Sequence, residues 1–147
     1  MIVPDVNLLL YATIDAFAEH PAARRWWEER LNEEVEIGLA APALFGFVRI
    51  ATNPRVLAPP LPVDDCLARV ESWLERPQVN FLLPGPRHIE LAFRLLRELG
   101  VAANLTTDVQ LAALAIEYQA ELHSNDADFW RFPQLRWINP LKAPKGS

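Results

Sequence analysis

The chain has 147 residues, 51% of them hydrophobic and 22% charged. A chain of this length forms one domain with a substantial core, and its single cysteine excludes an internal disulfide framework or a cysteine-based zinc cluster. The formal net charge of −5 argues against a protein that wraps duplex nucleic acid through a basic surface. We therefore expect a single domain over residues 1–141 and a short C-terminal tail at 142–147.

The apolar runs are too short for a membrane span or a secretion signal. The longest run near the N-terminus is Leu8–Ala12, and Asp5 stands just before it. A signal peptide needs a basic start and a longer apolar region, and a spanning helix needs about 20 apolar residues. We expect a cytoplasmic protein with no membrane association.

Short apolar runs alternate with segments of helical periodicity along the chain. The predicted strands cover residues 1–5, 37–41, 79–83, 121–124 and 135–138. The first predicted helical segments are a turn at 8–11, a helix at 20–32 and a helix from Pro42 to the break before Pro54. A further helix is capped by Asp64 or Asp65. The last two are a helix at 86–99, ended by Gly100, and a helix capped by Thr106 or Thr107. This alternation predicts an α/β fold with a parallel sheet.

Four aspartates fall near the predicted carboxyl ends of the strands. Asp5 ends the first strand, Asp126 and Asp128 follow the fourth, and Asp108 stands at the start of a helix. Ligands of open α/β sheets bind outside these strand ends, so the four acids can converge. Carboxylates held that close repel one another unless a cation or proton intervenes, and an all-oxygen cluster suits Mg²⁺ or Mn²⁺. Such a metal would activate water for attack on a phosphodiester.

Each acid also has a purely structural interpretation. Asp5 would be a turn residue, Asp108 a first-turn acid favoured by the helix dipole, and Asp126 or Asp128 the cap of a short helix. Other chemistries find little support in the sequence. The three histidines have no partner at metal-ligand spacing, and neither a Gly-x-Ser-x-Gly turn nor a glycine-rich phosphate loop is present. A phosphatase of the haloacid dehalogenase type needs a second acid where this chain has Asn7.

Several motifs resemble the PIN domain family. They are Asp5-Val6-Asn7-Leu8-Leu9-Leu10-Tyr11-Ala12, Thr107-Asp108 with the helix that follows, and Ser124-Asn125-Asp126-Ala127-Asp128-Phe129. Residues 47–56 and 135–141 further resemble the PIN toxins of VapBC-type toxin–antitoxin pairs. The resemblance extends over nearly the whole chain in order and spacing.

The resemblance implies a fold, an activity and a set of site residues. The implied fold is a three-layer α/β/α sandwich with a parallel sheet of about five strands. The implied activity is Mg²⁺-dependent endoribonuclease cleavage of single-stranded or structured RNA, with Mn²⁺ able to substitute. By motif position, Asp5, Asp108 and Asp126 carry over as catalytic and metal-binding acids, and Asp128 as a further metal ligand.

The resemblance also implies a cognate VapB-type antitoxin and a homodimer. Five Trp and seven Phe independently favour a dimer, because aromatic residues are enriched in interface cores. Arg49 and Arg55, which flank the Asn53-Pro54 turn, are candidates to contact RNA phosphates.

One position departs from the family pattern. Most PIN nucleases place a Glu on the helix after the second strand, and Gly46 occupies that position here. The number of metal ions is therefore open. The alternative to a toxin nuclease is a catalytically weak or degenerate PIN domain that acts as a binding module.

Overall fold

The structure, a computed structural model, describes residues 1–102 and 105–142. Nearly all of the predicted tail lies outside these residues. In the described part of the chain the elements follow in the order β1 (Ile2–Pro4), α1 (Val6–Thr13), α2 (His20–Leu31), β2 (Ile37–Ala40), α3 (Ala41–Ala51), α4 (Val63–Leu74), β3 (Val79–Leu82), α5 (His88–Leu99), α6 (Thr106–Glu117), β4 (Glu121–His123), the 3₁₀ helix η2 (Ala127–Arg131) and β5 (Arg136–Ile138).

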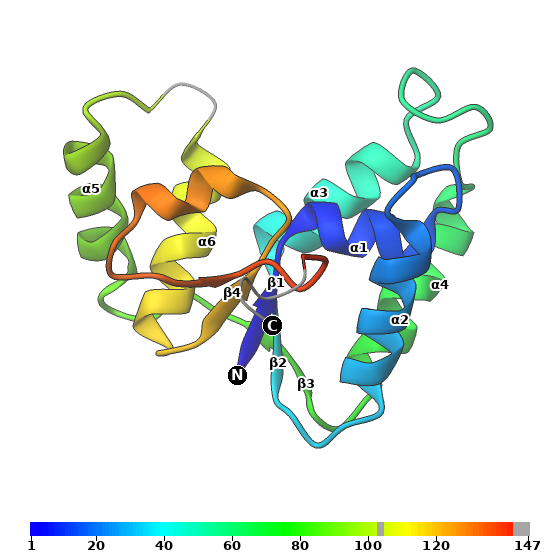
Figure 1. The fold of residues 1–147 in the computed structure, drawn as a ribbon, viewed down its shortest axis with the longest axis horizontal. Helices are drawn as coiled ribbons and strands as arrows, with labels where there is room; N and C mark the ends of the chain where they lie inside the picture. The colour runs from blue at the N-terminus through cyan, green and yellow to red at the C-terminus, as the bar shows by residue number, and fades with distance from the viewer. Residues whose placement is uncertain (103–104, 143–147) are drawn as a thin grey trace.

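The strands form one parallel sheet in the order β3-β2-β1-β4-β5. Figure 1 shows α1 to α4 on one side of this sheet and α5 and α6 on the other. The predicted α/β class, with three layers and five parallel strands, is therefore confirmed. Covering both faces with helices explains why β1 and β2 are continuously buried.

The strand order reverses between β1 and β4. From β1 the chain moves outward to β2 and β3, then crosses the sheet through α5 and α6 and returns to pair β4 with β1. Pro4 lies opposite His123 in this pairing, so the two strands end side by side. A reversal of this kind opens a crevice at the carboxyl ends of the two strands, where α/β proteins bind their ligands.

Three predicted helix starts are wrong in detail. The first helix is a full eight-residue helix that begins at Val6, because the Asp5 side chain accepts a hydrogen bond from the Val6 amide. Pro62 precedes α4, so Asp64 and Asp65 lie inside its first turn and cap nothing. Leu105 likewise precedes α6, which places Thr106 and Thr107 within the helix. The end of α5 is as predicted, with Gly100 at a φ of 77°.

The core extends through both helical layers. Three of the five tryptophans, Trp26, Trp27 and Trp73, are buried against one another beneath α2 and α4. Much of the aromatic content that favoured a dimer is therefore used inside one chain. No helix within the described residues is both long enough and apolar enough to cross a membrane.

Candidate active site

Asp5 occupies the end of β1 as a buried carboxylate. It is 6% exposed. Its Oδ1 accepts a hydrogen bond from the Val6 amide at 2.7 Å, and its Oδ2 accepts one from the Ser124 hydroxyl at 2.7 Å. Burial raises the pKa of Asp5, while the hydrogen bonds from Ser124 and Val6 oppose that rise. The carboxylate is thus fixed in position but poorly solvated.

Ser124 connects the ends of β1 and β4. Besides donating to Asp5, its Oγ accepts hydrogen bonds from the Asp126 amide at 3.0 Å and from Asn7 Nδ2 at 3.2 Å. Asn7 Oδ1 accepts a hydrogen bond from the Asn125 amide at 3.3 Å. Sequence reasoning missed Ser124 as a site residue. Its signal was a small polar residue placed directly after a buried strand and before two acids.

Asp108 lies in the first turn of α6 and is half-buried. Desolvation, followed by the negative charges of Asp5, Asp126 and Asp128, raises its pKa to about 6. The structure therefore brings the four predicted acids close enough to interact, although they come from three separate segments. No side-chain hydrogen bond or ion pair with another residue of 1–102 and 105–142 offsets the charge of Asp108.

Asp126 and Asp128 combine a structural role with a place at this cluster. Asp126 begins η2, and its Oδ1 accepts a hydrogen bond from the Asp128 amide at 2.9 Å. The helix-cap interpretation of Asp126 is thus correct. Asp128 is exposed, and its Oδ1 lies 3.7 Å from Arg131 Nη2. We call Asp5, Asp108, Asp126 and Asp128 the acidic cluster.

The acidic cluster has the chemistry of a site for a hard divalent cation. Its donors are all carboxylate oxygens, the ligands that Mg²⁺ and Mn²⁺ prefer, and a cation would relieve the repulsion recorded in the pKa of Asp108. Across the described ranges, no three His, Cys, Asp or Glu side chains form a ready-made ligand set. Carboxylate donors of this kind suit a cation that keeps several of its waters, as Mg²⁺ does.

Gly46 is a close-packing position. It lies buried in α3, and a Cβ atom built there would meet Val6 Cγ2 at 2.8 Å. Val6 directly follows Asp5, and α1 packs against α3. A Cβ at this position would collide with Val6, so the close packing of α3 against α1 accounts for the glycine.

The two predicted RNA-binding arginines do not join the acidic cluster. Arg49 is in the last turn of α3 and Arg55 is in the loop beyond it, and both are exposed. At about 1.5 Å per residue, Arg49 lies roughly 12 Å along α3 from the helix start at the sheet. Neither arginine is among the charges that act on Asp5 or Asp108.

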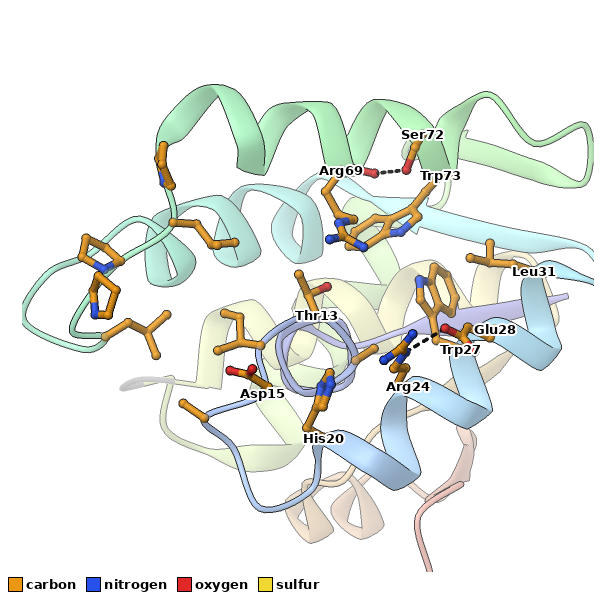
Figure 2. A pocket seen from close by; sticks show the side chains of 18 of the residues that line it. Thr13, Asp15, His20, Arg24, Trp27, Glu28, Leu31, Arg69, Ser72 and Trp73 are labelled. Carbon is orange, nitrogen blue, oxygen red and sulfur yellow. Dashed lines mark hydrogen bonds and ion pairs between the residues drawn. The ribbon is translucent and has the colours of Figure 1, made fainter.

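A groove of about 1150 Å³ lies between α1, α2 and α4. Figure 2 shows Arg24 and Trp27 of α2 on one side of it, Arg69 and Trp73 of α4 on another, and Thr13 of α1 between them. Within the described residues, Trp27 Nε1 and Thr13 Oγ1 are buried without a hydrogen-bond partner. The groove is therefore lined by a mixture of apolar and charged side chains, and its charges include both arginines and acids.

Comparison with known proteins shows the family. A model of the PIN domain matches residues 2–135. The chain is 56% identical over 142 residues to Ribonuclease VapC33 of Mycobacterium tuberculosis, a match that covers 97% of this chain and 99% of that protein. It is 37% identical over 140 residues to Ribonuclease VapC37 of the same organism, covering 95% and 97% of the two chains.

Solved structures show the same fold at low sequence identity. VapBC-1 from nontypeable Haemophilus influenzae matches with a TM-score of 0.69 and 19% identity, covering 97% of this chain and 100% of that one. VapBC2 from Rickettsia felis, bound to a DNA fragment from its promoter, matches with a TM-score of 0.68 and 18% identity, covering 95% and 98%. With the acidic cluster at the strand reversal and these matches along its length, the chain belongs to the PIN domain family, among the VapC ribonucleases.

Proposed function

We propose that the chain is a metal-dependent endoribonuclease toxin that hydrolyses phosphodiester bonds of single-stranded or structured RNA. The observation that carries this proposal is the convergence of four carboxylates around Asp108, whose pKa rises to about 6 through desolvation and then through the charges of the other three acids. Carboxylates from separate segments repel one another where they meet at a strand reversal, and a bound cation relieves this repulsion. The two VapC relatives are named ribonucleases, which supports the assignment.

The four acids have distinct parts in this reaction. Asp5 and Asp108 are the principal ligands for Mg²⁺, which Mn²⁺ can replace, and Asp128 is a supporting ligand. Asp126 helps to hold the metal or orients the attacking water through its carboxylate. When bound, the metal supplies a water of lowered pKa and neutralises charge on the phosphodiester. Ser124 holds Asp5 in place, so the geometry does not depend on the substrate.

The test is RNA cleavage by Asp5→Asn and Asp108→Asn. Both variants keep the side-chain shape and remove one charge, so we expect no cleavage of a labelled RNA in EDTA-treated buffer with added Mg²⁺ or Mn²⁺. Circular dichroism should show an unchanged fold. Full activity of Asp108→Asn would overturn the assignment.

A degenerate PIN domain that only binds its partner is the second candidate. The observation that favours it is Gly46 at the position where most PIN nucleases carry a Glu. Titration with Mn²⁺ separates the two proposals. A nuclease should show saturable binding that Asp108→Asn abolishes, whereas a degenerate site should show none.

We further propose a VapB-type antitoxin as the partner, bound in the groove between α1, α2 and α4. Two of the similar structures are VapBC complexes, and the groove, at about 1150 Å³, offers room for a segment of a partner chain. Arg69 lines the groove and would pair with an acidic residue of that segment. Both the toxin and this partner would act in the cytoplasm.

If the antitoxin binds in this groove, reversing a charge at the groove should weaken its binding, and reversing a charge elsewhere should not. Arg69→Glu should weaken binding of the protein encoded by the neighbouring open reading frame, measured by calorimetry. Arg97→Glu on the exposed surface of α5 is the matched control and should leave binding unchanged. Equal effects of the two changes would place the partner elsewhere.

The homodimer remains a proposal, with a defined surface. Phe81 of edge strand β3, Leu83 just after that strand, and Ile89 and Phe93 of α5 are exposed, and a second copy would cover them. Light scattering should then give twice the chain mass of 16.7 kDa, and Phe93→Glu should return it to the monomer value. Arg49 and Arg55 are proposed to bind RNA phosphates outside the acidic cluster.

A further inference from the structure

The acidic cluster has to accept an anionic substrate although its neighbouring charges are negative. The charges that act on Asp108 are those of Asp5, Asp126 and Asp128, and no cation acts on Asp5 or Asp108. A phosphodiester that approaches this cluster needs hydrogen-bond donors as well as the metal. The following inference rests on the proposed ribonuclease function and asks which residue supplies such a donor.

Tyr11 lies beside the acidic cluster on the same helix that Asp5 begins. Asn7 and Tyr11 are four residues apart in α1, so their side chains share one face of the helix. Asn7 contacts the 124–126 loop through Ser124 Oγ and the Asn125 amide. The charges of Asp5 and Asp126 act on the Tyr11 hydroxyl.

Two uncharged donors beside Asp5 are already engaged. The Ser124 hydroxyl donates to Asp5, and the Asn7 amide donates toward Asp5 and Ser124. Asn125 Oδ1 accepts a hydrogen bond from Asn139 Nδ2 at 3.0 Å, so the Asn125 side chain is engaged as well. The Tyr11 hydroxyl proton has no acceptor among the described residues.

The position of the Tyr11 ring is also fixed. It packs edge-on against Phe17, with ring centroids 5.1 Å apart and an interplanar angle of 63°. His20 Nδ1 lies 2.7 Å from the backbone oxygen of Tyr11. Burial, followed by the charge of Glu19, raises the pKa of Tyr11, so the hydroxyl keeps its proton in neutral solution.

We propose that Tyr11 is a substrate-contacting residue, whose hydroxyl donates a hydrogen bond to a phosphate oxygen of the RNA bound at the acidic cluster. A preorganised neutral donor stabilises negative charge without cancelling the carboxylates that hold the metal. A hydrogen bond to a charged group is worth enough for an effect of about 10- to 100-fold. Tyr11→Phe removes this donor and keeps the ring against Phe17.

The test compares Tyr11→Phe with Tyr118→Phe. Tyr118, the other tyrosine in the chain, donates its hydroxyl proton to the Leu83 carbonyl at 2.8 Å, away from the acidic cluster. We expect Tyr11→Phe to reduce kcat/KM for cleavage of a labelled RNA about 10- to 100-fold, with Mn²⁺ affinity unchanged. Tyr118→Phe should cleave like the wild type. Equal cleavage by both variants, or loss of Mn²⁺ affinity in Tyr11→Phe, would overturn the inference.

A binding experiment separates this inference from the ribonuclease proposal. With Asp108 intact, fluorescence anisotropy with a cleavage-resistant phosphorothioate form of the same labelled RNA and Mg²⁺ should show weaker binding by Tyr11→Phe than by the wild type. If the wild type binds RNA without cleaving it, the ribonuclease proposal fails, and the Tyr11 effect on binding still decides the inference. If Tyr11→Phe leaves binding and cleavage unaltered while the wild type cleaves, only the Tyr11 inference is wrong.

Discussion

Asp5 and Asp108 belong to the same acidic cluster, but their carboxylates have different surroundings. Asp5 is buried at the end of β1 and accepts hydrogen bonds from the Val6 amide and the Ser124 hydroxyl. Asp108 is half-buried at the start of α6, and its pKa of about 6 reflects desolvation and three neighbouring carboxylates. The fold therefore holds the Asp5 carboxylate in place through hydrogen bonds, whereas no contact among the described residues offsets the charge of Asp108.

The two acids therefore contribute differently to the site. Asp5 sets the position of a ligand, and Asp108 contributes to the affinity for a cation. A carboxylate fixed by protein donors sets the position of a ligand, because those donors form with the fold. A carboxylate destabilised by like charges supplies the drive to bind a cation, since binding relieves the repulsion. The following predictions test each half of this comparison, beginning with the largest expected effect.

Removing the Ser124 hydroxyl should weaken the fold at the Asp5 end. Ser124→Ala deletes the donor to Asp5 and the acceptor for the Asp126 amide, and leaves a buried charge with less support. We expect a loss of about 2–3 kcal/mol and a fall in Tm of roughly 5–10 °C, together with reduced RNA cleavage. Thermal unfolding followed by circular dichroism measures the stability change.

Ser72→Ala is the matched control for that experiment. Ser72 Oγ also donates a hydrogen bond, to the Arg69 carbonyl at 2.6 Å, but it does so on the exposed surface of α4. Its removal should change stability by less than about 0.5 kcal/mol. Equal losses in the two variants would show that Ser124 does not support Asp5 in particular.

The Asp108 half of the comparison predicts a pH dependence of stability. The pKa of Asp108 is about 6, against 3.8 for an unperturbed aspartate. Between these values the folded protein binds more protons than the unfolded chain, so this group lowers stability as pH rises toward 7. Asp108→Asn should therefore be more stable than the wild type at pH 7.5 and lose this advantage near pH 4.

Solvent screening at a half-buried position limits the gain to about 1 kcal/mol, or roughly 2–4 °C in Tm. Unfolding curves of the wild type and Asp108→Asn in EDTA, collected from pH 4 to 7.5, give the difference directly. Saturating Mg²⁺ should abolish or reverse it, because the cation stabilises only the wild-type cluster. A gain that is independent of pH would mean that repulsion at Asp108 is not its source.

The sequence predicted the positions of the acids better than the contacts between them. Asp5 and Asp126 follow apolar runs, so the rule that ligands bind at strand ends identifies them without an alignment. The link between Asp5 and Ser124 joins residues 119 positions apart. No periodicity signals such a contact, because it depends on the pairing of β1 with β4.

The sequence also failed to predict two helix caps, although a cap depends on residues that are close together in the chain. Asp64, Asp65, Thr106 and Thr107 have side chains that suit a cap, yet Pro62 and Leu105 occupy those positions. Capping depends on the backbone angles at one residue, which tertiary packing shifts by a turn. Gly46 was ambiguous for a related reason. The sequence shows a missing side chain, and only the structure shows that Val6 lies 2.8 Å from where its Cβ would be.

The smallest predicted effect concerns how Gly46 supports the Asp5 end. Gly46→Ala adds a methyl group that collides with Val6 Cγ2, and a β-branched side chain has few alternative rotamers with which to yield. Overpacking costs about 1–3 kcal/mol, while replacing a helical glycine returns about 0.5–1 kcal/mol. We expect a net loss of stability of about 0.5–1 kcal/mol, and Gly46→Glu should lose more stability without tightening Mn²⁺ binding.

Val6→Ala provides the decisive comparison. It opens the space beside position 46, so Gly46→Ala should be neutral or stabilising in that background, a coupling that a double-mutant cycle measures. If Gly46→Ala is equally destabilising with and without Val6→Ala, or if Gly46→Glu tightens Mn²⁺ binding with the fold intact, then position 46 faces the metal rather than α1.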